Sequence, residues 1–281
     1  MKKNKFTMKS ISFMLIVSMY CAFANAQTKP ALNDSINKLD AKFKKQGIWK
    51  KYYSNGKMRY EGQFKDDNPY GQFKYYYEED GKLKTISDFY NNGKSTHTTH
   101  YFNTGKIEAK GNYFDNKKDS LWVYYNEAGV KVSEEFYKNN QKNGIWRIFY
   151  YDTGTISEET TWKDGVKNGP AKEYYDNGKL KVEKNFLNNL LDGVYHVYDY
   201  NGALVGAGKF SKNLKEGLWV TLRPDGTTKV KYNYKAGVLL KMEDLRTPEE
   251  KAKEVINDEG KEKSQQKYPD QDKDKSKEIF E

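Results

Sequence analysis

The sequence GIWKKYYSNGK at residues 47–57 contains the pattern that decides the fold. A glycine precedes a tryptophan by two residues, two adjacent tyrosines follow, and Asn55-Gly56 ends the segment. Asn-Gly between two ring-rich runs is the strongest short-range signal of a β-hairpin, because the turn needs positive φ and these residues adopt it most easily. The segment therefore predicts a strand that ends in a tight turn.

The residues after this turn alternate in polarity, as expected of a second strand. From 58 to 64, apolar residues and glycine occupy the even positions, and charged or amide residues occupy the odd ones. A period of two indicates a strand. The same alternation follows Gly178, with Lys184 as the one exception. It changes phase after Gly129, where we expect a bulge or a register shift.

The hairpin pattern recurs along the chain at a fixed period. Copies begin at residues 47, 71, 95, 120, 144, 169, 193 and 217, and those at 95, 120 and 169 are degenerate. A period of this length indicates an array in which each unit packs against its neighbours. A second glycine keeps the same spacing, and eight residues after it every copy has an aromatic residue: Phe64, Phe89, Tyr113, Tyr137, Trp162, Phe186, Phe210 and Tyr234.

These observations predict an all-β protein, an elongated single antiparallel sheet of about eight hairpins. At ~4.8 Å per strand, such an array would be about 75 Å long. The composition agrees, because 24 Tyr, 14 Phe and 5 Trp can cover the faces of a thin sheet. It disfavours a Rossmann domain, a barrel enzyme and a helical bundle. The net charge of +10 is foremost a matter of solubility and edge protection, and otherwise an attraction for anionic partners.

Residues 1–26 have the pattern of a signal peptide. A Lys-rich start precedes an apolar run from Ile11 to Ala24, and the small-x-small sequence at 24–26 matches a cleavage site. The run is too short to span a bilayer. We therefore expect an exported protein that is periplasmic, envelope-associated or extracellular. The only cysteine, Cys21, lies in this segment, and bulky Tyr20 beside it disfavours lipidation there.

The predicted domain order places the eight hairpins at residues 47–244, between two polar flanks. In the leader at 27–46, Ile36, Leu39 and Phe43 have helical spacing, which predicts a short helix capping the first hairpin. The alternative is a disordered leader. Residues 245–281 mix charges of both signs and contain few aliphatic residues, which predicts a solvated tail that is disordered or partly helical.

No constellation in the chain points to catalysis. His97 and His100 are three residues apart, so in a strand they face opposite sides and cannot share a metal. His196 lies in an ordinary unit. Adjacent glutamates at 134–135 and 158–159 also face opposite sides, which does not suit a general acid and base. We therefore expect no enzyme activity, no catalytic residues, no bound metal and no cofactor.

Units of the form Gly-x-Trp-x-x-Tyr-Tyr-x-x-Gly-Lys, as at residues 47–57, resemble the variant MORN repeats, and the resemblance covers residues 47–240. Such arrays are found in proteins labelled as YwqK-family antitoxins. That label implies a non-enzymatic protein that binds and neutralises a toxin, and related MORN arrays are implicated in membrane-lipid or protein binding. The predicted export departs from a cytoplasmic antitoxin role.

The aromatic rows are the feature with binding potential, since exposed rings flanked by lysines can stack sugars or hold an extended peptide. The structural alternative is that the rings only pack on one another. We expect an exported, non-catalytic scaffold that binds a protein partner or a surface polymer. Alternatives are a toxin-neutralising antitoxin or immunity-type protein, and a glycan- or cell-wall-binding module. Membrane lipid is a further candidate partner, nucleic acid is not expected, and the sequence does not define an oligomeric state. The candidate binding residues are Trp49, Trp122, Trp146 and Trp219.

Overall fold

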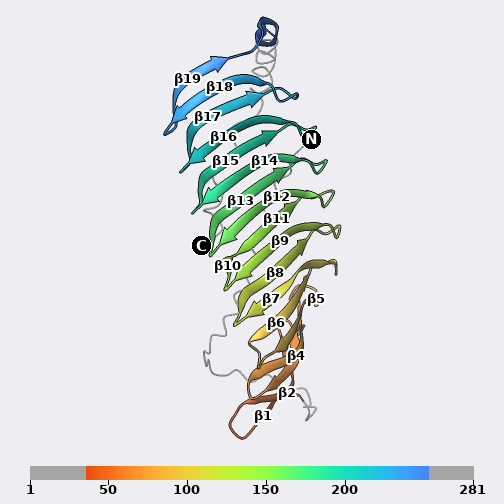
Figure 1. The fold of residues 1–281 in the computed structure, drawn as a ribbon. Coiled ribbons are helices and arrows are strands. Elements are labelled where there is room, and N and C mark those ends of the chain that lie inside the picture. Colours follow the sequence, from red (N-terminus) through yellow and green to blue (C-terminus); the bar gives the residue numbers. More distant parts are fainter. Residues whose placement is uncertain (1–35, 253–281) are drawn as a thin grey trace. The chain divides into compact units, whose positions relative to one another are not determined.

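The computed structural model describes residues 36–252 and consists almost entirely of strands (Figure 1). The strands lie in the compact unit Gln27–Leu245 and form one long, open antiparallel sheet, so the predicted fold class is confirmed. Their bounds are β1 Lys38–Leu39, β2 Lys45–Tyr52, β3 Met58–Lys65, β4 Asn68–Tyr76, β5 Leu83–Tyr90, β6 Ser95–Tyr101, β7 Ile107–Phe114, β8 Lys117–Tyr125, β9 Lys131–Lys138, β10 Gln141–Lys142, β11 Gly144–Phe149, β12 Ile156–Lys163, β13 Val166–Tyr174, β14 Leu180–Leu187, β15 Leu190–Tyr198, β16 Leu204–Ser211, β17 Leu214–Leu222, β18 Thr228–Lys235 and β19 Val238–Asp244.

The chain adds its hairpins to the sheet one after another. The eight hairpins are β2–β3, β4–β5, β6–β7, β8–β9, β11–β12, β13–β14, β15–β16 and β17–β18. The short strands β10 and β11 both pair with β9 and are two parts of one strand, interrupted at Asn143. β9 pairs with β8 in the same register as β3 pairs with β2, so the irregularity predicted after Gly129 is not formed. The change of phase instead places Ser133 and Glu135 where Tyr60 and Gly62 lie in the first hairpin. β1 lies against β2, and β19 lies against β18.

The first glycine of each repeat lies at a β-bulge rather than in regular strand. Gly47, Gly71 and Gly217, for example, have φ of 69°, 65° and 66°, in the left-handed region. Successive hairpins accordingly pair with a register shift. The copies beginning at 95 and 120 have serine in place of this glycine. Ser120 keeps the left-handed conformation with a φ of 60°, whereas Ser95 does not, and the β5–β6 ladder has no shift. As a result Thr98, and not His97, lies opposite Gly111, in the place that Trp49 takes opposite Gly62 in the first hairpin. This degenerate copy is therefore displaced by one residue from the repeat that the sequence suggested.

The connections between hairpins are tighter than the polar loops that the sequence suggested. Residues 163–168 lie mostly in β12 and β13, and the turn itself is Asp164-Gly165. Most of these junctions are two-residue turns with positive φ at both positions, such as Asn188 (50°) and Asn189 (69°). That geometry is the type I′ turn, whose twist matches that of the flanking strands.

Each of these turns is bonded to the preceding unit. Asn140 donates its backbone N–H to the carbonyl of Lys118 (3.0 Å), and its side-chain oxygen accepts the N–H of Lys118 (2.6 Å). Asn189 makes the same two bonds to Lys167 (2.9 and 2.8 Å). At the opposite ends of the strands, the Tyr150 hydroxyl donates to the carbonyl of Tyr174 (2.7 Å). Both rows of turns therefore fix the position of one hairpin on the next.

The helix predicted in the leader is not formed in its described part, residues 36–46. Ile36 bridges to Ile48, β1 pairs with β2, and Phe43 has a φ of 59°. The carboxylate of Asp40 accepts the backbone N–H groups of Lys42 (2.8 Å) and Lys44 (3.0 Å), which closes a turn instead. So short a helix is marginal without packing, and strand pairing with β2 satisfies more backbone groups. Residues 27–35 lie outside the described residues.

The other predicted segments are described only at one end. Residues 1–26, with the predicted signal peptide and Cys21, lie outside the described part, as do residues 253–281. Residues 248–252 form a short helical segment. Thr247 and Glu250 cap it reciprocally, since the N–H of Thr247 donates to the Glu250 carboxylate (2.8 Å) and the N–H of Glu250 donates to the Thr247 hydroxyl (3.3 Å).

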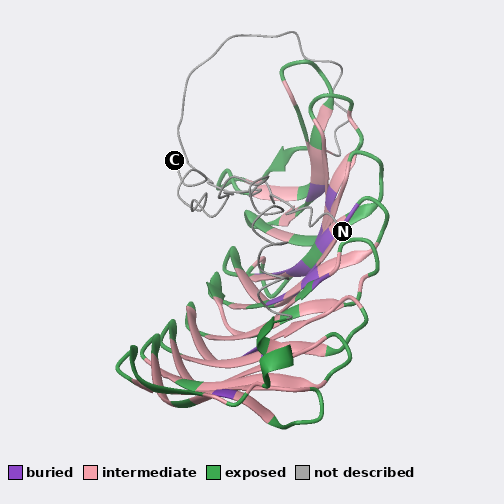
Figure 2. Ribbon diagram, turned by 90° about the horizontal axis from the view of Figure 1, so that it is seen from above, coloured by how far each residue is buried: buried purple, intermediate pink, exposed green. Residues whose placement is uncertain are grey.

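Within residues 36–252 no second layer packs on the sheet, so most of its core forms within one face. Buried residues lie along the middle of the strands, and the turns are exposed (Figure 2). A ring from one hairpin lies flat over a small residue of the hairpin before it. A Cβ added at Gly111 would lie 2.3 Å from Cδ2 of Trp122, and one added at Gly208 would lie 2.1 Å from Cδ2 of Trp219. These glycines provide the space that the rings occupy.

This packing predicts that Gly111→Ala lowers the free energy of unfolding by about 1–3 kcal/mol, because the Trp122 ring must move. Gly206→Ala is the matched control, since its Cβ would meet nothing closer than 3.6 Å and its backbone φ is ordinary. We expect the control to change stability by less than about 1 kcal/mol. Urea unfolding followed by circular dichroism measures both, and equal midpoints for the two variants would contradict the contact.

Candidate functional site

The two faces of the sheet carry different chemistry. We call one the aromatic face, because the ring positions Trp49, Phe73, Trp122, Trp146, Tyr195 and Trp219 lie on it. We call the other the charged face, because its middle row includes Glu134, Arg147, Glu159, Lys172, Glu183 and His196, paired across neighbouring strands.

The four tryptophans predicted as binding residues all lie on the aromatic face, but they are not equally accessible. Trp122 is only 1% exposed, so its ring is part of the core. Trp49, Trp146 and Trp219 are half-buried. Three of the indole N–H groups donate to a backbone carbonyl ten residues earlier, at distances of 3.0, 2.8 and 3.0 Å for Trp122, Trp146 and Trp219. These three indole rings therefore have a structural role, because they link adjacent hairpins.

The rings form a nearly continuous row. Trp122 meets Tyr113 edge-on with 4.9 Å between ring centroids, and Trp219 meets Phe210 in the same way at 4.9 Å. Trp146 lies 5.9 Å from Trp162 of the same hairpin. These separations are those at which aromatic pairs attract one another. Packing among the rings, the structural alternative to binding, is therefore present along this face.

A row of lysines runs beside these rings, and sequence reasoning did not single it out. Lys142 is the clearest case, with its Nζ 4.0 Å from the ring centroid of Trp146 and 4.3 Å from that of Trp162. The spacing in the sequence could have identified these lysines, because each lies two residues before the first residue of a repeat. We call the set the lysine row: Lys45, Lys118, Lys142, Lys167 and Lys215, each within 5.1 Å of at least one ring centroid.

The ammonium groups of the lysine row are held by rings and not by carboxylates. None of the five forms an ion pair in the part of the chain that the structure describes. Burial lowers the pKa of Lys118 and of Lys142, and the charge of Glu135 opposes that shift at both. The Lys118 ammonium donates to the hydroxyl of Tyr124 (2.6 Å). Such partly desolvated cations attract anions more strongly than ordinary surface lysines do.

The one buried carboxylate of this region is already satisfied by neighbours. Glu135 is 3% exposed and accepts hydrogen bonds from the hydroxyls of Ser133 (3.0 Å) and Tyr137 (2.8 Å). Burial and the nearby Glu135 charge raise the pKa values of Tyr124 and Tyr137 well above the usual tyrosine value. Both phenols are therefore neutral donors near pH 7, and the cluster holds the middle of the array together.

The charged face is neutralised by its own residues. Arg147 bonds Glu159 through Nε (2.7 Å) and Glu134 through Nη1 (3.3 Å), which links three strands. Burial opposes ionisation of both glutamates, but the hydrogen bonds from Lys131, Arg147 and Tyr174 outweigh it and lower their pKa values. Cations and carboxylates alternate here, so this face has little net charge to offer an ionic partner.

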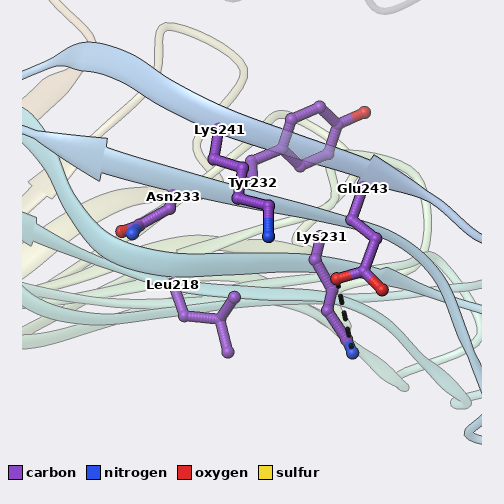
Figure 3. A pocket seen from close by; sticks show the side chains of 6 residues that line it. All are labelled: Leu218, Lys231, Tyr232, Asn233, Lys241 and Glu243. Carbon is purple, nitrogen blue, oxygen red and sulfur yellow. Dashed lines mark ion pairs between the residues drawn. The ribbon is translucent and has the colours of Figure 1, made fainter.

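A hollow of about 220 Å³ lies on the charged face near the last strands (Figure 3). Its floor includes the ion pair between Lys231 and Glu243 (3.9 Å). The remaining lining residues are Leu218, Tyr232, Asn233 and Lys241. No arrangement of titratable groups in it suggests a reaction.

The histidines lie apart and bond to different partners. His97 bonds Asn112 (2.8 Å), and His100, on the opposite face as predicted, bonds Thr85 (3.0 Å) and stacks on Trp122. His196 lies 3.5 Å from Glu183. Within residues 36–252, no group of three or more His, Cys, Asp or Glu is arranged to hold a metal ion. Over the same range, no helix has the length and apolar character needed to span a membrane.

Comparison with known families identifies the repeat at two places. The MORN repeat variant matches residues 45–66, which contain the hairpin β2–β3, and residues 167–188, which contain all of the hairpin β13–β14 except Val166. The chain therefore carries the MORN repeat variant at these two places, and each match covers about one hairpin. The resemblance to YwqK-family antitoxins is not shown by this match.

Similarity to solved structures is weak. The crystal structure of TarM is 14% identical over 34% of this chain and 20% of its own, with a TM-score of 0.26. The crystal structure of TcdB2-TccC3-Cdc42 is 12% identical over 66% of this chain and 12% of its own, with a TM-score of 0.19. The chain thus spans a fifth or less of these proteins, and no function is transferred from them. No curated protein matches the chain.

The environment of His100 predicts a pH dependence of stability. Burial, helped by the charges of Lys118 and Lys84, lowers the pKa of His100 to about 4 from 6.5. In the unfolded chain His100 binds a proton below about pH 6.5, whereas in the folded chain it binds one only below about pH 4. The free energy of unfolding therefore falls as the pH decreases from 6.5 to 4. The loss reaches at most about 3 kcal/mol.

The variant His100→Gln separates this effect from the titration of carboxylates. Its free energy of unfolding, measured in urea from pH 7 to pH 4, should fall less than that of the natural chain. The difference between the two curves should grow between pH 6.5 and pH 4. Parallel curves would show that His100 titrates normally.

Proposed function

We propose that the protein is an exported, non-catalytic repeat scaffold whose aromatic face binds an acidic surface polymer. The supporting observation is the lysine row, a series of ammonium groups that lie on aromatic rings and form no ion pair among the described residues. The export element rests on the sequence of residues 1–26.

The spacing of the row suits a linear ligand. Lys118, Lys142 and Lys167 occupy the same position in consecutive hairpins, so they recur every two strands, or about 10 Å. A polymer with carboxylates at regular intervals can meet several of them at once. Repeated weak contacts then add up, as they do for any multivalent ligand.

The rings beside the row contribute a second kind of contact. Trp146 and Trp219 are half-buried, so each keeps part of its surface accessible beside a lysine. Aromatic surface next to a cation matches a sugar ring that carries a carboxylate. Trp122 has a structural role in this proposal, because its ring is covered.

The charged face gives this proposal a matched control. The triple variant Lys142→Gln, Lys167→Gln and Lys215→Gln removes three positive charges from the lysine row. The second triple variant, Lys50→Gln, Lys74→Gln and Lys172→Gln, removes three from the charged face, where Lys50 and Lys172 pair with glutamates. With each charge contact worth about 0.5–1 kcal/mol, we expect the first to weaken binding of polygalacturonate about tenfold to hundredfold. The control should change it by less than about twofold.

Binding is measured by titration calorimetry at low and at moderate salt, and the affinity should fall as salt rises. Equal losses in the two triple variants would reject the lysine row as the site. Binding of neutral dextran as strong as that of polygalacturonate would favour a glycan-binding module instead. Capture of a protein toxin encoded beside the gene, with no polymer binding, would favour the antitoxin alternative, and turnover of the polymer would contradict a non-catalytic role.

A further inference from the structure

The two edges of the sheet end differently. At one edge, β1 pairs with β2, and Asn37 covers the next part of that strand. The N–H of Asn37 donates to the carbonyl of Ile48 (2.8 Å), and its side chain accepts the N–H of Lys50 (2.8 Å). At the other edge, β19 pairs with β18 alone among the described residues. In the part of the chain that the structure describes, one end of the ladder is therefore closed and the other is open.

The open edge is also apolar. Val238, Leu240 and Met242 of β19 are 62%, 59% and 55% exposed. Leu239, the other apolar residue of this strand, is 45% exposed. An exposed edge strand of this kind is a template for pairing with another strand. No proline lies between residues 238 and 242, and Lys241 is the one charged residue there.

The backbone of β19 has groups that point away from β18. The N–H of Leu245 donates to the carbonyl of Lys229, so Leu245 faces β18. Alternate residues of an antiparallel strand face alternate sides, which places the backbone groups of Glu243 and Lys241 toward β18. Those of Met242, between them, point outward.

The sequence of β19 is complementary to itself around Met242. If two copies pair antiparallel with Met242 opposite Met242, these residues exchange two backbone hydrogen bonds. Lys241 of each copy then lies opposite Glu243 of the other, which gives two such pairs. Both are non-hydrogen-bonded pairs, in which the side chains are closer together. Glu243 already meets Lys231 at 3.9 Å (Figure 3), so the alternation of charges would continue across the junction.

We propose that β19 pairs antiparallel with β19 of a second copy, so that two sheets join into one through a two-fold symmetric interface. Pairing of β19 with the opposite edge of another copy would form an open filament, but β1 and Asn37 occupy that edge. The occupant of the open edge is therefore a second β19. This inference does not depend on the proposed polymer binding.

A charge-reversal pair tests the register on the full chain. Lys241→Glu and Glu243→Lys each place like charges opposite one another twice in a homodimer, and each should weaken self-association about tenfold. A mixture of the two variants restores both attractive pairs, so it should dimerise about as well as the natural chain. Lys209→Glu is the control of equal charge change, because Lys209 lies in β16, away from the edge.

Sedimentation velocity across a range of concentrations measures each association, and circular dichroism confirms that each variant keeps its strand content. Met242→Pro is the second variant, since it removes an outward N–H without touching the ladder to β18, and it should yield monomers. A monomeric natural chain at all concentrations would overturn the proposal. So would a mixture of the charge variants that associates no better than either alone, or a Met242→Pro variant that still dimerises.

Discussion

The contact on which the structure depends is the ring of one hairpin lying over the small residue of the hairpin before it. A single sheet has no second layer to bury its apolar surface against, so burial must come from neighbours along the sheet. Trp122 over Gly111 and Trp219 over Gly208 show how this is achieved. The indole N–H of each ring also reaches the carbonyl of the preceding hairpin, so packing and hydrogen bonding fix the same register. The units that begin with β8 and β17 therefore depend on the hairpins before them.

This constraint also explains why the two faces diverge in chemistry. Strand alternation places ring positions on one side and their sequence neighbours on the other. Where rings supply the packing, lysines lie on them and keep their charge uncompensated, as Lys142 does between Trp146 and Trp162. On the other side, cations such as Arg147 bond directly to glutamates.

The period and the turns carried most of the information about the fold. Asn55-Gly56 and its counterparts determine the hairpins, and a period of two determines which side chains share a face, so the architecture was predictable from the sequence. The bulges were not, because a glycine that begins a strand and a glycine in a bulge have the same sequence signature. The buried state of Trp122 also depends on rings from adjacent units that no single repeat contains. The lysine row shows the same limit, since its spacing is visible in the sequence but its contact with two rings is not.

The ends of the array show what happens when the repeat stops. At the first edge, β1 and the turn at Asp40 replace the missing hairpin, and their hydrogen bonds satisfy part of the backbone of β2. At the last edge, β19 keeps its pairing to β18 but loses the features of a repeat. Tyr232 of β18 lies between Trp219 of β17 on one side and Met242 of β19 on the other. A flexible thioether there gives an apolar surface that fits many neighbours, whereas a tryptophan in that place would have needed a small partner residue. The departure from the repeat at β19 therefore suits a strand that meets an identical strand better than one that continues the array.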